Sequence, residues 1–198
     1  MMKPPNPERR SEKSHRATLE AALDLCAEQG YAQATVEGIA ARAGVSKKTI
    51  YRWWPSKGAV VLEAVHEASL LPTAFPDTGD LAADLHTQLM GVIDMLQAPR
   101  VRSAFIGVLT EAQHDPALAG RLHCQWLRPR IDEFQDRLRR AQELEQVPHD
   151  VDLDITMDLL YGPIFHRLMV HLPLPDAVHM RKVIVSALPS LGRPPGGR

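Results

Sequence analysis

Cationic, hydroxyl-bearing and aromatic side chains are concentrated in the segment SKKTIYRWWPSK, which spans positions 46–57. If this segment forms a helix, Ile50 and Trp54 share its inner face with Val45 just before it, and the polar side chains point outward. Such side chains suit the phosphates and base edges of DNA, although a solvated helical face beside an ordinary turn is the alternative. The outward-facing residues are Lys48, Thr49, Tyr51 and Arg52.

The expected DNA contacts divide into two kinds. Lys47, Lys48 and Arg52 are expected to approach base edges, and Arg52 is able to make a bidentate contact to guanine. Helix N-termini at Val36 and Lys57 also suit phosphate. The residues expected to hold phosphates through hydroxyl groups, indole N–H or charge are Thr35, Ser46, Thr49, Tyr51, Trp53 and Lys57.

The elements that position these residues are two short helices joined by a tight turn. Thr35 is a candidate N-cap for the first helix, and Gly44 can adopt the left-handed conformation that ends it. Ser46 is a candidate cap for the second helix, which Pro55 ends because proline lacks the backbone N–H. This spacing is typical of a helix-turn-helix, whose second helix lies in the major groove of DNA.

Residues 15–62 resemble the DNA-binding domain of the TetR (tetracycline-repressor) family of bacterial regulators. The matching segments are A-x-x-L-C-A-E-Q-G-Y at 22–31, TVEGIAARAGVS at 35–46 and TIYRWWPSK at 49–57. The family usually has phenylalanine at the position of Trp54 and glutamate at the position of Gly58. The first difference keeps an aromatic ring, and the second removes a carboxylate from the first turn of the next helix.

Hydrophobic periodicity along the chain predicts an all-α protein of about nine helices. A helix-turn-helix DNA-binding domain is expected at 14–60 after a flexible basic arm at 1–13. A larger helical ligand-binding and dimerisation domain is expected at 61–190, before a disordered tail at 191–198. The first helix should begin near Ser14, a single helix with a kink at Pro129 should span about 116–145, and the loop 72–79 marks a domain boundary.

The last two predicted helices, at about 151–172 and 175–188, carry apolar stripes. Two such helices can form a four-helix bundle with a second copy, and the resemblance implies a homodimer of this kind. The alternative is that both stripes pack inside one subunit. The stripe residues are Ile155, Leu159, Ile164, Leu168, Met180, Val183, Ile184, Ala187 and Leu188.

The resemblance also implies that residues 73–175 receive a regulatory signal from a small molecule. Ligand binding would favour a state whose two DNA-reading heads no longer match the operator half-sites. Plain core packing is the alternative for each candidate pocket residue. The candidates are Phe105, Trp126, Tyr161, Phe165 and His166.

Charge and composition support a regulator that binds DNA. Residues 1–58 carry ten Lys and Arg residues against six acidic ones, whereas the rest carries thirteen against eighteen. The basic arm at 1–13 could reach a minor groove, or it could merely aid solubility. The absence of a long apolar run or secretory signal and the presence of only two cysteines, Cys26 and Cys124, indicate a cytoplasmic protein.

Catalytic, metal-binding and cofactor signatures are not evident in the sequence, and no cofactor, metal or membrane partner is expected. There is no H-E-x-x-H, paired C-x-x-C, G-x-S-x-G or phosphate-binding loop. The sequence therefore favours a dimeric repressor that binds double-stranded DNA at a palindromic operator and is released by an unidentified small molecule. A regulator of the same fold without small-molecule input is the alternative, and a helical enzyme is a remote one.

Overall fold

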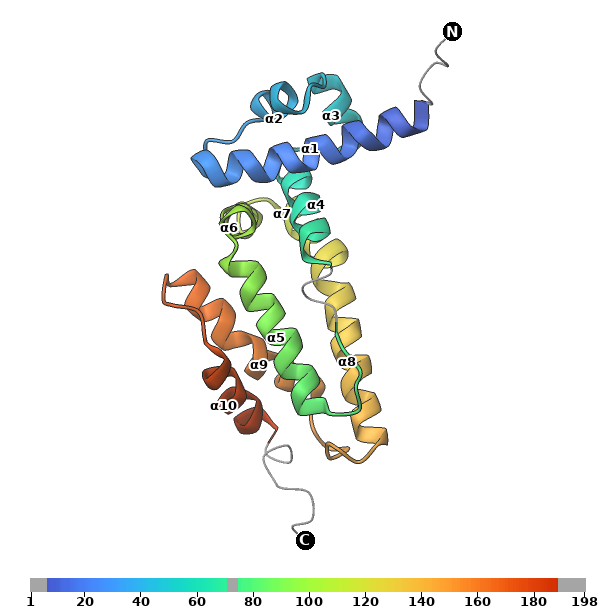
Figure 1. The fold of residues 1–198 in the computed structure, drawn as a ribbon, viewed down its shortest axis with the longest axis vertical. Helices are drawn as coiled ribbons and strands as arrows, with labels where there is room; N and C mark the ends of the chain where they lie inside the picture. The colour runs from blue at the N-terminus through green and yellow to red at the C-terminus, as the bar shows by residue number, and fades with distance from the viewer. Residues whose placement is uncertain (1–6, 71–74, 189–198) are drawn as a thin grey trace. The chain divides into compact units, whose positions relative to one another are not determined.

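The computed structural model describes residues 7–70 and 75–188, and these residues form helices and loops without any β-strand (Figure 1). The all-α class expected from the sequence is therefore confirmed. The described residues group into two compact units. The first comprises residues 7–68 and Ala98–Trp126, and the second comprises Ser69–Gln97, without residues 71–74, and residues 127–188.

The first unit is built around one long helix, α1, which packs against both α2 and α6. The predicted inner face of α1 is confirmed, because Leu19, Ala22, Leu23 and Cys26 are all buried. Burial raises the pKa of the Cys26 thiol to about 11, which keeps it neutral in a packing role. The helices of this unit are α1 (Pro7–Gln29), α2 (Val36–Ala43), α3 (Lys47–Trp53), α4 (Lys57–Ser69), α6 (Pro99–Ala112) and α7 (Pro116–Arg121). The last residue of α4, Ser69, is grouped with the second unit.

Helix α1 begins at Pro7, seven residues before the expected start at Ser14. The prediction of a flexible arm over residues 1–13 is therefore wrong for residues 7–13, which are helical. Proline suits the first position of a helix, and the glutamate, arginine and lysine residues that follow have high helix propensity. Residues 1–6 of the predicted arm and residues 191–198 of the predicted tail lie outside the described residues.

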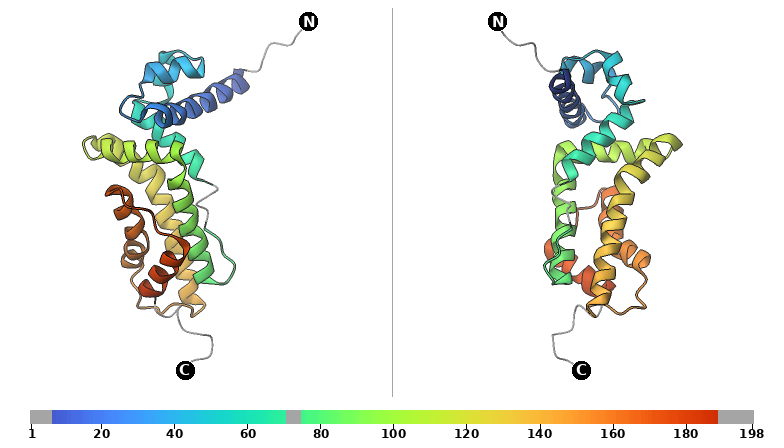
Figure 2. Two further views of the ribbon diagram at one scale, coloured as in Figure 1. Left: turned by 60° about the vertical axis from the view of Figure 1, so that its left-hand side comes forward. Right: turned by 90° about the vertical axis from the view of Figure 1, so that its right-hand side faces the viewer.

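The second unit contains α5, α8, α9 and α10, with α10 packed against both α5 and α9 (Figures 1 and 2). Asp84 on α5 and Arg137 on α8 form a buried ion pair in which Arg137 Nη2 lies 2.6 Å from Asp84 Oδ2. Thr78 Oγ1 also donates to this carboxylate over 2.6 Å. The helices of this unit are α5 (Leu81–Gln97), α8 (Arg128–Glu143), α9 (Leu153–Met169) and α10 (Ala177–Ala187).

The helix expected over about 116–145 is present as three consecutive segments: α7, a π-helical stretch η1 (Leu122–Leu127) and α8. Pro129 accounts for the π-helical segment η1 that precedes it. Its ring lacks an N–H and would clash with the carbonyl of Gln125 in a regular α-helix, and π-type widening relieves that clash. If these segments are counted as one helix, the described residues contain the nine helices that the sequence predicts.

The described helices include none that is both long enough and apolar enough to cross a membrane. Residues 71–74 of the expected boundary loop lie outside the described residues. The two compact units each combine segments from two parts of the chain, because α6 and α7 group with the N-terminal helices.

Candidate nucleic-acid interface

Two helix caps and one glycine fix the turn between α2 and α3, and all three follow directly from the sequence. Thr35 Oγ1 accepts a hydrogen bond from the Gly38 N–H over 3.1 Å and caps α2. Gly44 ends α2 with a φ of +67°, in the left-handed region that glycine adopts without strain. Ser46 Oγ accepts from the Thr49 N–H over 3.1 Å and caps α3. The predicted caps and turn are therefore confirmed.

The inner side of α3 is anchored in the core of the first unit. Ile50 is completely buried, and Trp54, which follows α3, is also buried. Trp54 Nε1 donates to Glu63 Oε2 on α4 over 2.5 Å. Arg42 of α2 makes a bidentate ion pair with Glu28 of α1, with N–O distances of 2.7 and 2.6 Å. These links hold the helix-turn-helix against α1 and α4.

The outer side of α3 carries exposed polar and cationic groups, as the sequence predicts. Lys48, Tyr51 and Arg52 are exposed, and the Arg52 guanidinium lies 5.2 Å from the centre of the Trp53 ring. Lys47 Nζ lies 2.9 Å from Glu37 Oε1 in an exposed ion pair. This hydrogen bond raises the pKa of Lys47 and lowers that of Glu37. Of the other predicted phosphate contacts, Thr35 and Ser46 are exposed and Thr49 and Trp53 are half-buried.

Two predicted phosphate contacts differ from the rest. The Lys57 side chain is directed toward Tyr31: its Nζ donates to the Tyr31 carbonyl over 3.0 Å and lies 4.0 Å from the ring centre. The Val36 side chain is only 7% exposed and belongs to the core. Val36 can therefore offer a phosphate only its backbone N–H at the start of α2. The Lys57 ammonium group already donates a hydrogen bond to the Tyr31 carbonyl within the unit.

A polar hollow of about 340 Å³ lies beside the start of α3. It includes Ser11 and Ser14 of α1, which were not among the predicted DNA contacts because they reach the turn only through the packing of α1. Hydroxyl groups and a guanidinium around one hollow are suited to a phosphate group. The lining residues are Ser11, Ser14, Gly44, Val45, Ser46, Thr49, Arg52 and Trp53.

The chain matches two family models that together cover both units. Residues 19–64 match the model of bacterial regulatory proteins of the tetR family, and residues 75–185 match that of the tetracyclin repressor-like C-terminal domain. The chain belongs to the TetR family. It is a DNA-binding transcriptional regulator of that family, and the resemblance seen in its sequence is confirmed.

Relatives and solved structures support membership of the TetR family along most of the chain. The HTH-type transcriptional regulator YdeS of Bacillus subtilis is 31% identical over 178 residues, which cover 90% of this chain and 89% of that protein. The DNA-binding transcriptional repressor TetR of Mycobacteroides abscessus is 30% identical over 170 residues, covering 85% and 88%. The crystal structure of the TetR family regulator SCO0332 has a TM-score of 0.76 at 34% identity and covers 90% of this chain and 98% of that one.

Gly58, where the TetR family usually has glutamate, is explained by packing. Gly58 is buried, and a Cβ atom there would lie 2.7 Å from both Leu118 Cδ2 and Glu111 Oε1. The absence of a side chain at Gly58 leaves room for the side chains of Glu111 on α6 and Leu118 on α7. A glutamate at this position would require both neighbours to move.

The five candidate ligand-binding residues of this TetR-family chain are divided between its two units. Phe105 and Trp126 are buried in the first unit, with ring centres 4.8 Å apart. In the second unit Tyr161 donates its hydroxyl hydrogen to Gln88 Oε1 over 2.6 Å, and burial raises its pKa. Phe165 is half-buried and His166 is exposed.

The candidate dimerisation residues fall into two groups. Five of them are buried within the subunit, as expected if the stripes pack inside one subunit: Ile164, Leu168, Met180, Ile184 and Leu188. Ile155 and Leu159 are 58% and 51% exposed, and Val183 and Ala187 are half-buried. A groove of about 320 Å³ is lined by Leu159, Pro163, Val183 and Ala187, together with His179, Lys182 and Ser186.

Proposed function

We propose that this TetR-family regulator is a cytoplasmic repressor that binds a palindromic operator as a homodimer and is released by a small molecule. The observation that carries the proposal is the outer face of α3, where Lys48, Tyr51 and Arg52 are exposed on a helix anchored by Ile50 and Trp54. A rigid helix with cationic side chains on its outer face suits the major groove.

In the proposed complex, Lys47, Lys48 and Arg52 approach base edges, with Arg52 bidentate to guanine. Phosphates are held by the hydroxyl-lined hollow beside α3 and by the backbone N–H groups at the start of α2. Ser11 and Ser14 join the predicted contacts because they line that hollow. Lys57 contributes to this surface only if it leaves the Tyr31 carbonyl, to which it donates a hydrogen bond.

Dimerisation is proposed through the C-terminal apolar face, defined by Ile155, Leu159, Pro163, Val183 and Ala187. Its exposed aliphatic side chains lie beside the groove between α9 and α10. A helix pair with such a face buries it against an identical pair in a four-helix arrangement. Two copies would then present two α3 helices to the two half-sites of a palindrome.

Small-molecule input is proposed for the second unit, where polar groups from three helices lie among aromatic side chains. Gln88 of α5 bonds to Tyr161 of α9, and Arg130 of α8 donates to Ser69 over 2.5 Å. The Tyr161 ring packs edge-on against Phe134, with centres 5.8 Å apart. A few polar groups among aromatic side chains are typical of sites for small organic ligands.

Selection of bound DNA from a random pool, followed by gel-shift titration at several salt concentrations, tests the proposal. We expect an inverted repeat, two chains per site and a steep loss of affinity with salt, because each neutralised phosphate contributes a slope of about −0.9 in log K against log salt. Failure to retain any DNA at low ionic strength would contradict the proposal. Compounds that raise the melting temperature and also release the selected DNA would identify the proposed effector class.

A further inference from the structure

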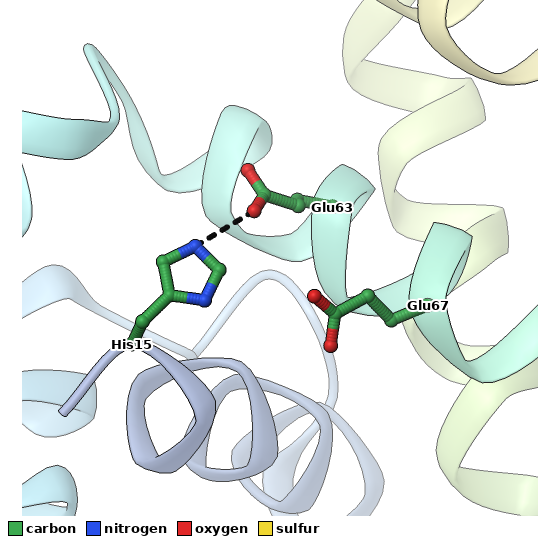
Figure 3. A group of neighbouring side chains, drawn as sticks. All are labelled: His15, Glu63 and Glu67. Carbon is green, nitrogen blue, oxygen red and sulfur yellow. Dashed lines mark ion pairs between the residues drawn. The ribbon is translucent and has the colours of Figure 1, made fainter. Parts of the chain in front are cut away.

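One imidazole and two carboxylates converge between α1 and α4 in the first unit (Figure 3). Glu63 and Glu67 are four residues apart on α4, so both lie on the helix face that is directed toward His15 of α1. His15 Nε2 lies 2.8 Å from Glu63 Oε1. One ligand atom from each of the three residues lies within 4.8 Å of the others.

Neighbouring indole groups orient two of these three side chains. The His15 ring is centred 4.8 Å from the Trp54 ring and 5.4 Å from the Trp53 ring. Trp54 Nε1 donates to Glu63 Oε2, which leaves Oε1 directed toward His15. A metal-binding carboxylate is commonly held in this way by a hydrogen bond from a group that does not itself bind the metal.

The three side chains match the ligands of a zinc ion. Zinc in proteins is bound by imidazole nitrogen and carboxylate oxygen at about 2.0–2.2 Å, which places tetrahedral ligand atoms about 3.4 Å apart. To reach that spacing from the 4.8 Å arrangement, Glu67, which is exposed, must rotate, and His15 Nε2 and Glu63 Oε1 must separate from their present 2.8 Å. Two carboxylates also balance the charge of a divalent cation.

The cluster opens onto a cavity of about 810 Å³ that both His15 and Glu67 line. This cavity gives an ion access from solvent and leaves room for a water molecule as a fourth ligand. Its other charged lining residues are Glu12, Lys13, Arg16 and Glu20. Because these two acids and two bases offset one another, the negative charge of the cluster itself remains available to a cation.

We propose that His15, Glu63 and Glu67 form a binding site for one Zn²⁺ ion per chain. The ion binds one imidazole nitrogen of His15 and one oxygen of each carboxylate, and it replaces the hydrogen bond between His15 and Glu63. Since the ligands come from α1 and α4, the bound ion fastens these two helices to each other. Without an ion, His15 and Glu63 remain an ordinary ion pair and Glu67 is solvated.

Zinc binding to the chelator-treated full chain can be measured by isothermal titration calorimetry in the absence of DNA. We expect one Zn²⁺ per chain, and a dissociation constant increased at least about 10-fold by Glu67→Gln or by His15→Gln. Glu67 is exposed, so its replacement leaves the fold intact even if His15→Gln does not. Zinc should also raise the melting temperature of the wild type more than that of Glu67→Gln.

Two control variants separate this site from other ligands on the chain. Glu12→Gln removes a carboxylate from the same cavity without touching the cluster and should bind Zn²⁺ like the wild type. Cys124→Ser removes the exposed thiol beside His123 and should do the same. The proposal is overturned if the wild type takes up no Zn²⁺, or if His15→Gln and Glu67→Gln both keep its stoichiometry and affinity.

Discussion

Arg52 combines an exposed guanidinium with a backbone fixed by the burial of Ile50 and Trp54 on either side of it. Its guanidinium rests against the Trp53 ring, which limits the orientations it must give up on binding. A preorganised arginine on α3 can donate two hydrogen bonds to one guanine, so Arg52 is the residue through which we expect α3 to distinguish bases.

Replacing Arg52 with alanine should therefore weaken binding to the selected operator by about 1–3 kcal/mol and relax specificity at one base position. Gel-shift titration against the operator and against its single-base variants measures both effects. Arg121→Ala is the matched control, since Arg121 is exposed on α7, outside the helix-turn-helix. Equal affinity of Arg52→Ala and wild type for every operator variant would contradict the assignment of base reading to Arg52.

Asp84 carries a buried, paired charge in the second unit. Its side chain is 1% exposed and that of its partner Arg137 is 4% exposed. Burial opposes the charge of Asp84, but hydrogen bonds from Thr78 and Arg137 outweigh burial and lower its pKa. The stabilisation is thus present above the ordinary pKa of aspartate and is lost as the pH falls through the lowered value.

Asp84→Asn should cost about 3–5 kcal/mol at neutral pH, because it leaves the buried Arg137 charge with only a longer contact, 3.5 Å from its Nε to Asp77 Oδ1. Urea unfolding at neutral and acidic pH measures the loss, and the gap between variant and wild type should narrow on acidification. Asp132→Asn, which removes an exposed partner of Arg128, is the control and should cost less than about 1 kcal/mol. A similar loss in both variants would mean that burial of the Asp84 pair is unimportant.

The outward residues of α3 could be predicted because helical spacing depends only on near neighbours in sequence. The orientation of Lys57 could not, since its acceptor, the Tyr31 carbonyl, lies 26 residues away in the chain. Ser11 and Ser14 escaped prediction for a related reason: their place beside Ser46 results from the packing of α1. The cluster of His15 with Glu63 and Glu67 likewise has no local sequence signature.

At the scale of elements, the turn between α1 and α2 is held to α6 by unusually close packing around a glycine. A Cβ atom at Gly107 would overlap Cγ and Cβ of Tyr31, which lies in that turn. The Tyr31 hydroxyl donates to Glu111 Oε2 over 2.8 Å, so the ring is held from its far end as well. The absence of a side chain at Gly107 is therefore a condition for the contact between this turn and α6.

Gly107→Ala should destabilise the protein by about 1–3 kcal/mol, because the added methyl group overpacks this contact. Gly120→Ala is a control of opposite sign: no atom lies within 4 Å of its would-be Cβ, and alanine favours a helix over glycine by about 1 kcal/mol. Thermal unfolding of the two variants should give melting temperatures on opposite sides of the wild type. A lowered melting temperature in both would contradict the packing argument.

The element boundaries show which local signals are reliable. Caps at Thr35 and Ser46 and the stop at Gly44 were predictable because each acts within four residues. Helix α1 starts seven residues before the expected position, since Pro7 suits the first helical turn. Pro129 was expected to kink the helix, and the stretch before it, Leu122–Leu127, is π-helical.

At the scale of the whole molecule, the sequence showed the fold class and the family, because both depend on motifs and periodicity. It did not show which apolar side chains of α9 and α10 are covered by their own chain. Ile164 and Ile155 have the same side chain on the same helix, yet the first is buried and the second is 58% exposed. This difference depends on how α9 packs against α8 and α10, which periodicity does not specify.

Leu159→Glu should convert the proposed dimer to monomer, because it places a charge in the C-terminal apolar face of both copies. Loss of two buried leucines predicts a dimer dissociation constant at least about 100-fold higher, which sedimentation velocity measures. Leu144→Glu is the matched control, since Leu144 is 54% exposed but lies at the end of α8, outside that face. A Leu159→Glu protein that remains dimeric would place the interface elsewhere.

The stacking of His15 with Trp53 and Trp54 gives the protein a built-in optical reporter. The chain has three tryptophans, and two of them lie 5.3 Å apart at the end of α3. Indole emission responds to a neighbouring imidazole and to its protonation or metal coordination. Intrinsic fluorescence should therefore follow DNA and zinc titrations without any attached dye, and a Trp53→Phe variant would separate the half-buried emitter from the two buried ones, Trp54 and Trp126.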